Sequence, residues 1–254
     1  MVSARSLLTP LGLALGALAV LGCGGASRAE SPHVAFAFAQ PPSAPEDPTQ
    51  TPAFRYANMG RDACVAELER RQIPFARVDG ARGVLAPLRL TGPVHCITIR
   101  SVLPPKQRAS AAIEILDCRL VLALDDFAQI LAKYDVVEIV HMSVYRPPGK
   151  GWPEGRIGTR HGGALAIDAG RFIRKDGTAL DVEKDFHGRI GTKTCGPNTG
   201  PAPATPEAVA LRGIVCDAAD AKLFNVELTP DYNWPHRNHF HLEVTANVKW
   251  FLVH

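Results

Sequence analysis

The chain has 254 residues, of which 46% are hydrophobic and 21% charged, and its formal net charge is +3 at pH 7. A charge this close to neutral argues against a nucleic-acid-binding protein, because such proteins present a strongly basic surface. Once the N-terminal segment is set aside, about 200 residues remain, which is enough for one domain with a sizeable core.

The first residues read as a targeting signal. Arg5 supplies a positive charge, and the apolar run LLTPLGLALGALAVLG that follows is too short to span a membrane as a permanent helix. The run ends at Val20-Leu21-Gly22-Cys23, which resembles a bacterial lipobox, in which the cysteine becomes the lipidated first residue. We therefore expect residues 1–22 to be a lipoprotein-type signal peptide. Cys23 would anchor the chain to a membrane of the cell envelope, facing the periplasm or exterior. The alternative is an ordinary signal peptide in which the cysteine is coincidental.

Residues 24–53 are rich in Ala, Pro, Ser, Gly and Gln and lack helical or strand periodicity, apart from the short patch VAFAFA. This composition predicts a flexible tether over residues 23–55. Such a tether would let an anchored domain reach a polymer away from the membrane. A disordered leader without a spacing role is the other interpretation. The folded domain is expected over residues 56–254.

Three helices are predicted in chain order. Apolar residues recur at helical spacing over residues 62–71 and 118–133. Thr205 and Pro206 supply an N-cap and a first-turn proline for a third helix that runs to about residue 219.

Five strand signals lie between and after these helices. They are VHCITI, VVEIVHMSVY, ALAIDAGRFI, FNVEL and HFHLEV. No regular βαβ alternation is present, so the pattern predicts a single α+β domain with a mostly antiparallel central sheet flanked by helices.

Two histidine-rich motifs predict a metal site on one face of that sheet. His161 and Asp168 lie in TRHGGALAID, and His241 lies in PHRNHFHLE. Two imidazoles and one carboxylate leave a fourth zinc position open for water, which is the arrangement that catalytic zinc requires. A zinc ion (Zn²⁺) held only by cysteines is disfavoured, since the chain has no CxxC pair.

Further polar residues surround the predicted ligands. Along HFHLE, side chains alternate, so His239, His241 and Glu243 share one face of a strand. His239 and His236 are expected beside the metal as groups that handle protons, although His236 could equally be a surface residue in a turn. Glu243 either hydrogen-bonds a metal-ligating histidine or is solvated at the strand end.

Three other residues are candidates for binding substrate. Arg146 and Arg160 could contact a substrate carboxylate in a bidentate manner, or be structural. Tyr145 could donate a hydrogen bond to an oxyanion.

The motifs resemble those of a zinc metallopeptidase superfamily. It includes D-Ala-D-Ala carboxypeptidases, the penicillin-insensitive murein endopeptidase and the hedgehog signalling domain, which share [ST]xHxxGxAxD and a terminal HxH. From about residue 61 onward, the chain more closely resembles the extensin-like C-terminal domain family. The supporting stretches are CRLVLALDDF, SVYRPP, RHGGALAIDAGRFIRKDG, FNVELTPDYN and HFHLEV. By position, His239 resembles the catalytic histidine of the superfamily.

The resemblance implies a zinc-dependent hydrolase that cleaves amide bonds in peptidoglycan stem or cross-link peptides. Peptidoglycan would then be the partner. One alternative is a non-catalytic cell-wall-binding module with a structural zinc, and another is a hydrolase of a different amide or ester. The sequence indicates neither the bond cleaved nor the oligomeric state.

Five cysteines besides Cys23 suit an oxidising compartment. Loop length and the family resemblance favour the pairs Cys96–Cys118 and Cys195–Cys216, which leave Cys64 over. The family often carries a cysteine directly after the tyrosine at position 145, where this chain has Arg146. Its disulfide pattern therefore does not transfer as a whole.

Overall fold

A computed structural model describes residues 47–254 of the protein. The expected signal peptide, Cys23 and most of the expected tether lie outside the described residues. Within residues 47–254, no helix is long and apolar enough to cross a membrane.

Six α-helices and four 3-10 helices occur within the described residues. The α-helices are α1 (Pro52–Ala57), α2 (Arg61–Arg70), α3 (Pro105–Arg108), α4 (Cys118–Ala132), α5 (Val182–Asp185) and α6 (Pro206–Asp220), and the 3-10 helices are η1 (Pro48–Gln50), η2 (Ala112–Glu114), η3 (Arg160–Gly163) and η4 (Trp234–His236). The helices predicted from periodicity correspond to α2, α4 and α6. Thr205 caps α6 by accepting a hydrogen bond from the backbone N–H of Ala208.

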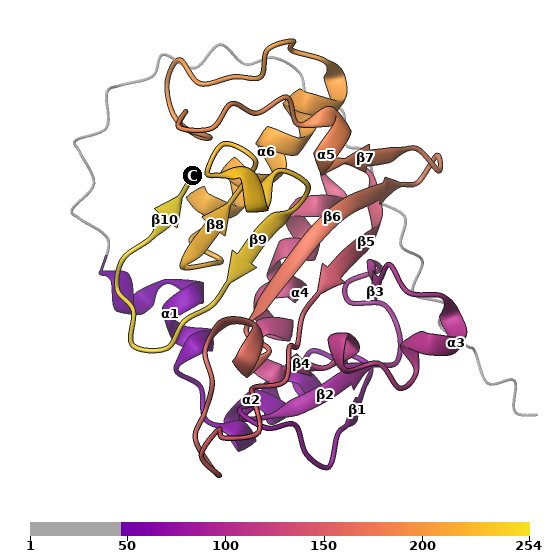
Figure 1. Cartoon of the computed structure of the whole chain (residues 1–254), viewed down its shortest axis with the longest axis vertical. Helices are drawn as coiled ribbons and strands as arrows, with labels where there is room; N and C mark the ends of the chain where they lie inside the picture. The colour runs from indigo at the N-terminus through magenta and orange to yellow at the C-terminus, as the bar shows by residue number, and fades with distance from the viewer. Residues whose placement is uncertain (1–46) are drawn as a thin grey trace, which may run out of the picture. The chain divides into compact units, whose positions relative to one another are not determined.

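Ten strands in the described part of the chain form two sheets. They are β1 (Phe75–Arg77), β2 (Pro87–Leu90), β3 (Thr98–Ser101), β4 (Leu116–Asp117), β5 (Val136–Ser143), β6 (Ala166–Arg174), β7 (Ala179–Asp181), β8 (Val226–Leu228), β9 (Phe240–Glu243) and β10 (Leu252–Val253). Strands β1, β2 and β4 form a small antiparallel sheet, and the other seven form the central sheet in the order β10-β8-β9-β6-β5-β3, with β7 paired to β6 (Figure 1). The α+β class is therefore confirmed.

The central sheet is mixed, whereas a mostly antiparallel sheet was predicted. Its inner pairs β5–β6, β6–β9 and β8–β9 are antiparallel, but β3 pairs with β5 and β10 pairs with β8 in parallel. The pair β3–β5 is parallel because α4 lies between these strands in the chain and returns it to the same end of the sheet.

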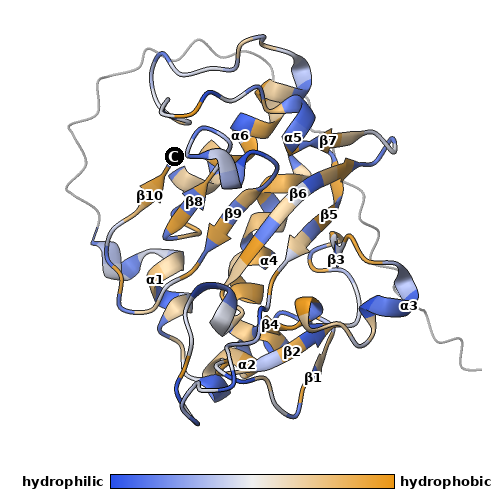
Figure 2. Cartoon of the chain, in the orientation of Figure 1, coloured by the Kyte–Doolittle hydropathy of each residue, from blue (hydrophilic) through white to orange (hydrophobic). Residues whose placement is uncertain are grey.

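The core lies between the sheet and helices α4 and α6. Twelve of the fifteen residues of α4 are buried, and Phe127 of this helix makes edge contacts with Phe172 and Phe224. Figure 2 shows apolar colour along much of α4 and polar colour over the short helix α3. The other face of the central strands is thus left for polar side chains.

A bulge in β6 changes which residues of this strand face the core. Its pairing with β5 shifts register between Ala169 and Arg171, so Gly170 is the extra residue. Asp168 faces away from the helices before the bulge, and Phe172 packs into the core after it. The bulge therefore places a carboxylate on the polar face of a strand that is otherwise part of the core.

The disulfide Cys64–Cys118 joins α2 to the first residue of α4, so the predicted pairing of Cys96 with Cys118 is wrong. The physical reason is that the apolar face of α2, with Val65 and Leu68 buried, packs on α4 and brings Cys64 to Cys118. The prediction of Cys195–Cys216 is confirmed. No cysteine among residues 47–254 is free.

Helical structure is present before residue 56, inside the segment expected to be the end of the tether. Thr51 caps α1, and Thr51 and Ala53 are buried. Residues 48–57 form η1 and α1 because Pro48 and Pro52 each occupy the first turn of a helix capped by the preceding Asp47 or Thr51.

Candidate metal centre

The turn that carries His161 is built on glycine. In η3, a Cβ atom on Gly163 would lie 2.3 Å from the carbonyl oxygen of Gly158, and one on Gly158 would lie 2.6 Å from Gly162. The two backbone segments can approach this closely only without side chains. The backbone N–H of Arg146 donates to the carbonyl oxygen of His161 and ties the turn to the end of β5.

The second and third candidate ligands face each other across two strands. Asp168 of β6 and His241 of β9 are direct partners in the antiparallel pair, so their side chains share a face. Both are buried, with 2% and 7% of their surface exposed.

The three side chains converge on one point. His161 Nε2 lies 3.1 Å from Asp168 Oδ1, and His241 Nδ1 lies 3.0 Å from the same oxygen. Donor atoms around a tetrahedral zinc ion, at about 2.0–2.1 Å from the metal, are about 3.3 Å apart. His161, Asp168 and His241 thus form a cluster that could hold a metal ion, as their spacing in the sequence predicted.

The outer ring nitrogen of each histidine in this cluster is already held. His161 Nδ1 lies 2.7 Å from the carbonyl oxygen of Val144, and His241 Nε2 lies 3.2 Å from Glu243 Oε2. Such partners fix the ring orientation and the tautomer, which leaves His161 Nε2 and His241 Nδ1 free to bind a metal. The donor set therefore fits a metal ion. Of the two interpretations of Glu243, the hydrogen bond to a histidine is the one that the structure has.

His239 and His236 lie beside the cluster. His239 Nε2 is 3.4 Å from Asp168 Oδ1, and the ring centroids of His236 and His239 are 5.2 Å apart. Asn233 accepts hydrogen bonds from the backbone N–H of His236 and contacts its ring Nδ1 at 2.6 Å, and Asn238 contacts His239 Nδ1 at 2.9 Å. The two asparagines orient these rings, and neither had been singled out from the sequence.

Burial and charge set the protonation of the centre. Burial would raise the pKa of Asp168, but its hydrogen bonds with His161 and His241 hold the pKa well below the usual range. Burial lowers the pKa of His239 to about 4, and it also lowers the pKa of His236. Both rings are therefore neutral near pH 7 and can accept a proton.

Two of the three predicted substrate-binding residues reach the cavity around the cluster. Arg146 forms an ion pair with Asp168 and also donates to the hydroxyl of Ser143 at 2.9 Å. Arg160 Nε lies 3.6 Å from Glu243 Oε2. Both side chains are more than half exposed, so their guanidinium groups remain open to a ligand.

Tyr145 is not at the cavity. Its ring is buried in the core, and its hydroxyl donates to the carbonyl oxygen of Arg82 at 2.8 Å. Arg146 is the next residue in the chain, and its side chain points to the opposite side. Arg146 therefore lines the cavity, whereas Tyr145 packs in the core.

The cavity has a volume of about 550 Å³ and an apolar wall that was not foreseen from the sequence. The wall consists of Val226, Leu228, Trp250 and Leu252 from β8 and the C-terminal segment. Trp250 is 56% exposed. The parallel pairing of β10 with β8 brings this wall beside the candidate metal ligands. No local sequence motif indicates that pairing.

A comparison with family models matches residues 62–252 to the extensin-like protein C-terminus. The match covers most of the chain, and the protein belongs to this family. No curated protein and no solved structure matches the chain.

Proposed function

We propose that the protein is a zinc-dependent hydrolase that cleaves amide bonds in the stem or cross-link peptides of peptidoglycan. The observation that carries the proposal is the cluster of His161, Asp168 and His241, with His239 directly beside it in an open cavity. The resemblance of both motifs to the zinc metallopeptidase superfamily supports the choice of metal and of reaction. Zinc supplies a Lewis acid that polarises a carbonyl group and makes water nucleophilic near neutral pH.

The side chains of the cavity have separable roles in this proposal. His239, neutral at pH 7 and at the edge of the cluster, accepts a proton from the attacking water and returns it to the departing amine. His236 assists as a second neutral base. Arg146 and Arg160 offer guanidinium groups to a carboxylate of the peptide.

The proposal includes a location in the bacterial cell envelope. The lipobox-like Cys23 would hold the protein at a membrane, and the disulfides suit an oxidising compartment. Peptidoglycan is the peptide-bearing polymer of that compartment.

The test is hydrolysis of isolated peptidoglycan by the purified protein, with zinc or with a chelator, followed by mass identification of released peptides. Zinc-dependent release is expected from wild type and from the control His95→Asn, which alters an exposed histidine outside the cavity. His161→Ala should release nothing. Zinc binding without any release, at the same fold stability, would instead favour a cell-wall-binding module with a structural zinc.

A further inference from the structure

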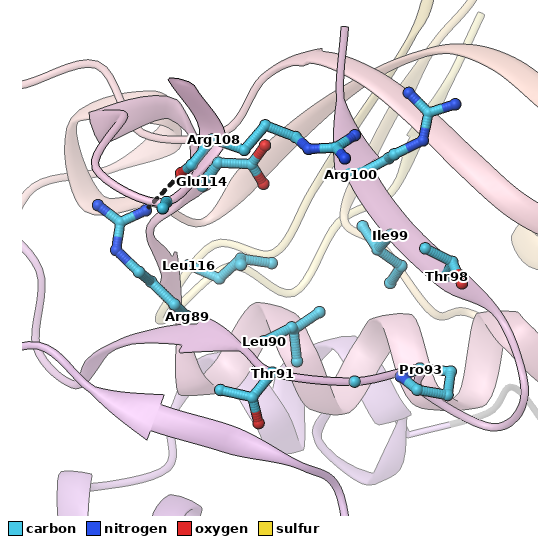
Figure 3. Close-up of a pocket in the computed structure, with 12 residues that line it drawn as sticks. Arg89, Leu90, Thr91, Pro93, Thr98, Ile99, Arg100, Arg108, Glu114 and Leu116 are labelled. Atoms are coloured by element: carbon cyan, nitrogen blue, oxygen red, sulfur yellow. Dashed lines mark hydrogen bonds between the residues drawn. The ribbon is translucent and has the colours of Figure 1, made fainter. Parts of the chain in front are cut away.

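A second cavity, of about 330 Å³, lies away from the metal centre. It is enclosed by β2 and the loop after it, by β3, and by the segment from α3 to β4 (Figure 3). It shares no lining residue with the cavity of the metal centre. Its size is at the lower end of small-molecule sites.

The inner surface of this cavity is apolar. Leu90, Ile99 and Leu116 come from three different strands, and Figure 3 shows their side chains gathered below the charged groups. Leu116 is only 2% exposed, so this surface is continuous with the core. An apolar group of a ligand would be removed from water here.

Two guanidinium groups at the rim, those of Arg89 and Arg108, have no carboxylate partner among residues 47–254. Arg89 donates to the carbonyl oxygens of Ala111, at 2.9 Å, and Arg108, at 3.4 Å, and these neutral groups leave its charge uncompensated. Figure 3 marks the bond to Arg108 as a dashed line. The side chain of Arg108 itself extends over the cavity and makes no hydrogen bond or ion pair with residues 47–254.

The other charged groups of the rim are already occupied. Arg100 pairs with Glu138 at 2.5 Å. Glu114 accepts hydrogen bonds from the backbone N–H and the hydroxyl of Ser101 and lies 3.6 Å from the buried His141. Counting these groups, three guanidinium charges stand against two carboxylates, which leaves an excess positive charge over an apolar surface.

We propose that this cavity binds a small organic carboxylate with an apolar body. The carboxylate would pair with Arg108, because a guanidinium group matches a carboxylate in a bidentate geometry, and the apolar body would cover Leu90, Ile99 and Leu116. Arg89, held by two carbonyl groups, adds a fixed positive charge. The proposal does not depend on the proposed hydrolase activity, since the two cavities are separate.

The experiment is a titration of the purified protein, with labelled leucine and isoleucine methyl groups, by N-acetylleucine. The expected result is a saturable shift of the methyl signals of Leu90, Ile99 and Leu116. N-Acetylleucinamide, which lacks the carboxylate, should bind at least about tenfold more weakly, the scale of a lost charge-assisted hydrogen bond.

Variants locate the effect on one side chain. Arg108→Met should weaken binding at least about tenfold, and Arg108→Lys should weaken it less, because charge is kept while the bidentate geometry is lost. Arg61→Met, at an exposed arginine outside both cavities, is the matched control and should bind as wild type does.

Four outcomes of the titrations with N-acetylleucine and its amide would overturn the proposal. They are shifts confined to Leu228 and Leu252 of the metal cavity, equal binding of the amide, unchanged binding by Arg108→Met, and no shift up to the solubility limit of the probe. Inorganic phosphate is titrated in parallel. Equal affinity for phosphate would show that the cavity selects charge alone and would also reject an organic ligand.

Discussion

His239 is the residue at which metal binding and chemistry can be separated. It contacts Asp168 but lies outside the set of three converging ligands. His239→Ala should keep its zinc and lose on the order of 10²-fold or more in hydrolysis rate, the effect expected for a positioned acid–base group. Zinc content by elemental analysis and release of peptides from peptidoglycan are the two measurements.

The outcomes for His239→Ala are distinguishable. A variant that loses its zinc would place His239 among the ligands. A variant that hydrolyses as fast as wild type would remove His239 from the reaction.

Under the proposed function, Glu243 would act on the bound metal through its hydrogen bond with His241. It is buried, and its second oxygen accepts a hydrogen bond from the hydroxyl of Thr245, so its geometry is fixed from both sides. Glu243→Gln should bind zinc about 10–100-fold more weakly, because the His241 ring loses a charged partner. Competition with a chromophoric chelator measures the affinity, and Glu154→Gln, at an exposed glutamate outside the cavity, serves as control. Equal zinc affinities for the two variants would show that Glu243 does not contribute to metal binding.

The cluster of candidate ligands could be predicted from the sequence because its residues lie in short motifs whose positions are set by turn and strand geometry. His161 lies in a turn that requires glycine. Asp168 and His241 lie in strands whose neighbouring apolar residues face the core, so both side chains face the opposite side of the sheet. The apolar wall with Trp250, and the asparagines that orient His236 and His239, depend on pairings between distant segments, for which spacing along the chain carries no signal.

At the scale of elements, the helices with clear apolar periodicity and caps were predicted within a few residues. The strands missing from the prediction, β1, β2, β4, β7 and β10, are two to four residues long. Such strands are too short for an alternation of apolar and polar residues to be recognised. They are stabilised mainly by their pairing with neighbouring strands in the sheet. The parallel edges of the central sheet were missed because the pairing of β3 with β5 and of β10 with β8 joins distant segments, for which spacing along the chain carries no signal.

Strand β8 carries a buried ionisable residue, Glu227, whose charged form is destabilised by burial. Glu227 faces the core, is fully buried, and neither of its carboxylate oxygens has a hydrogen-bond partner within residues 47–254. Burial raises its pKa well above 4.5. A group whose pKa is raised on folding favours the folded state below its unfolded pKa, and this contribution is lost as the pH rises above 4.5 towards the folded pKa.

Glu227→Gln should therefore stabilise the protein at neutral pH, and its advantage over wild type should grow as the pH is raised from 4.5. The reason is that the glutamine stays neutral, whereas the glutamate must be buried with a charge or hold a proton. Thermal unfolding of both proteins across this pH range measures the difference. Parallel curves of melting temperature against pH would contradict the pKa assignment.

The whole molecule depends on its two described disulfides to different degrees. Cys64–Cys118 spans 54 residues and Cys195–Cys216 spans 21. By reducing the entropy of the unfolded chain, the first disulfide stabilises the folded state by about 4 kcal/mol and the second by about 3 kcal/mol. The double variant Cys64→Ala/Cys118→Ala should accordingly lower the melting temperature by roughly 8–16 °C, and Cys195→Ala/Cys216→Ala by less. Calorimetry checks this order, and the reverse order would show that local strain outweighs loop length.

The proposed attachment to the membrane concerns the whole chain and would depend on the single residue Cys23. Cys23→Ser should move the protein from the detergent-soluble membrane pool to the periplasmic or secreted pool, because the lipid is its expected means of attachment. Fractionation and the mass of the mature N-terminus are the measurements. Equal partition of wild type and variant would mean that Cys23 is incidental.

The candidate metal ligands come from positions 161, 168 and 241, and β10, whose Leu252 lines their cavity, follows even later in the chain. A nascent chain offers two of the three ligands until His241 has been added, and a site that is not yet formed binds zinc only weakly. If the site binds zinc as proposed, its loading would come late in biogenesis, after α2 and α4 have been synthesised and can be cross-linked. In zinc-starved cells, the species expected to accumulate is a full-length, oxidised apoprotein that remains competent to take up metal, so the supply of zinc would set the amount of active protein without any change in its synthesis.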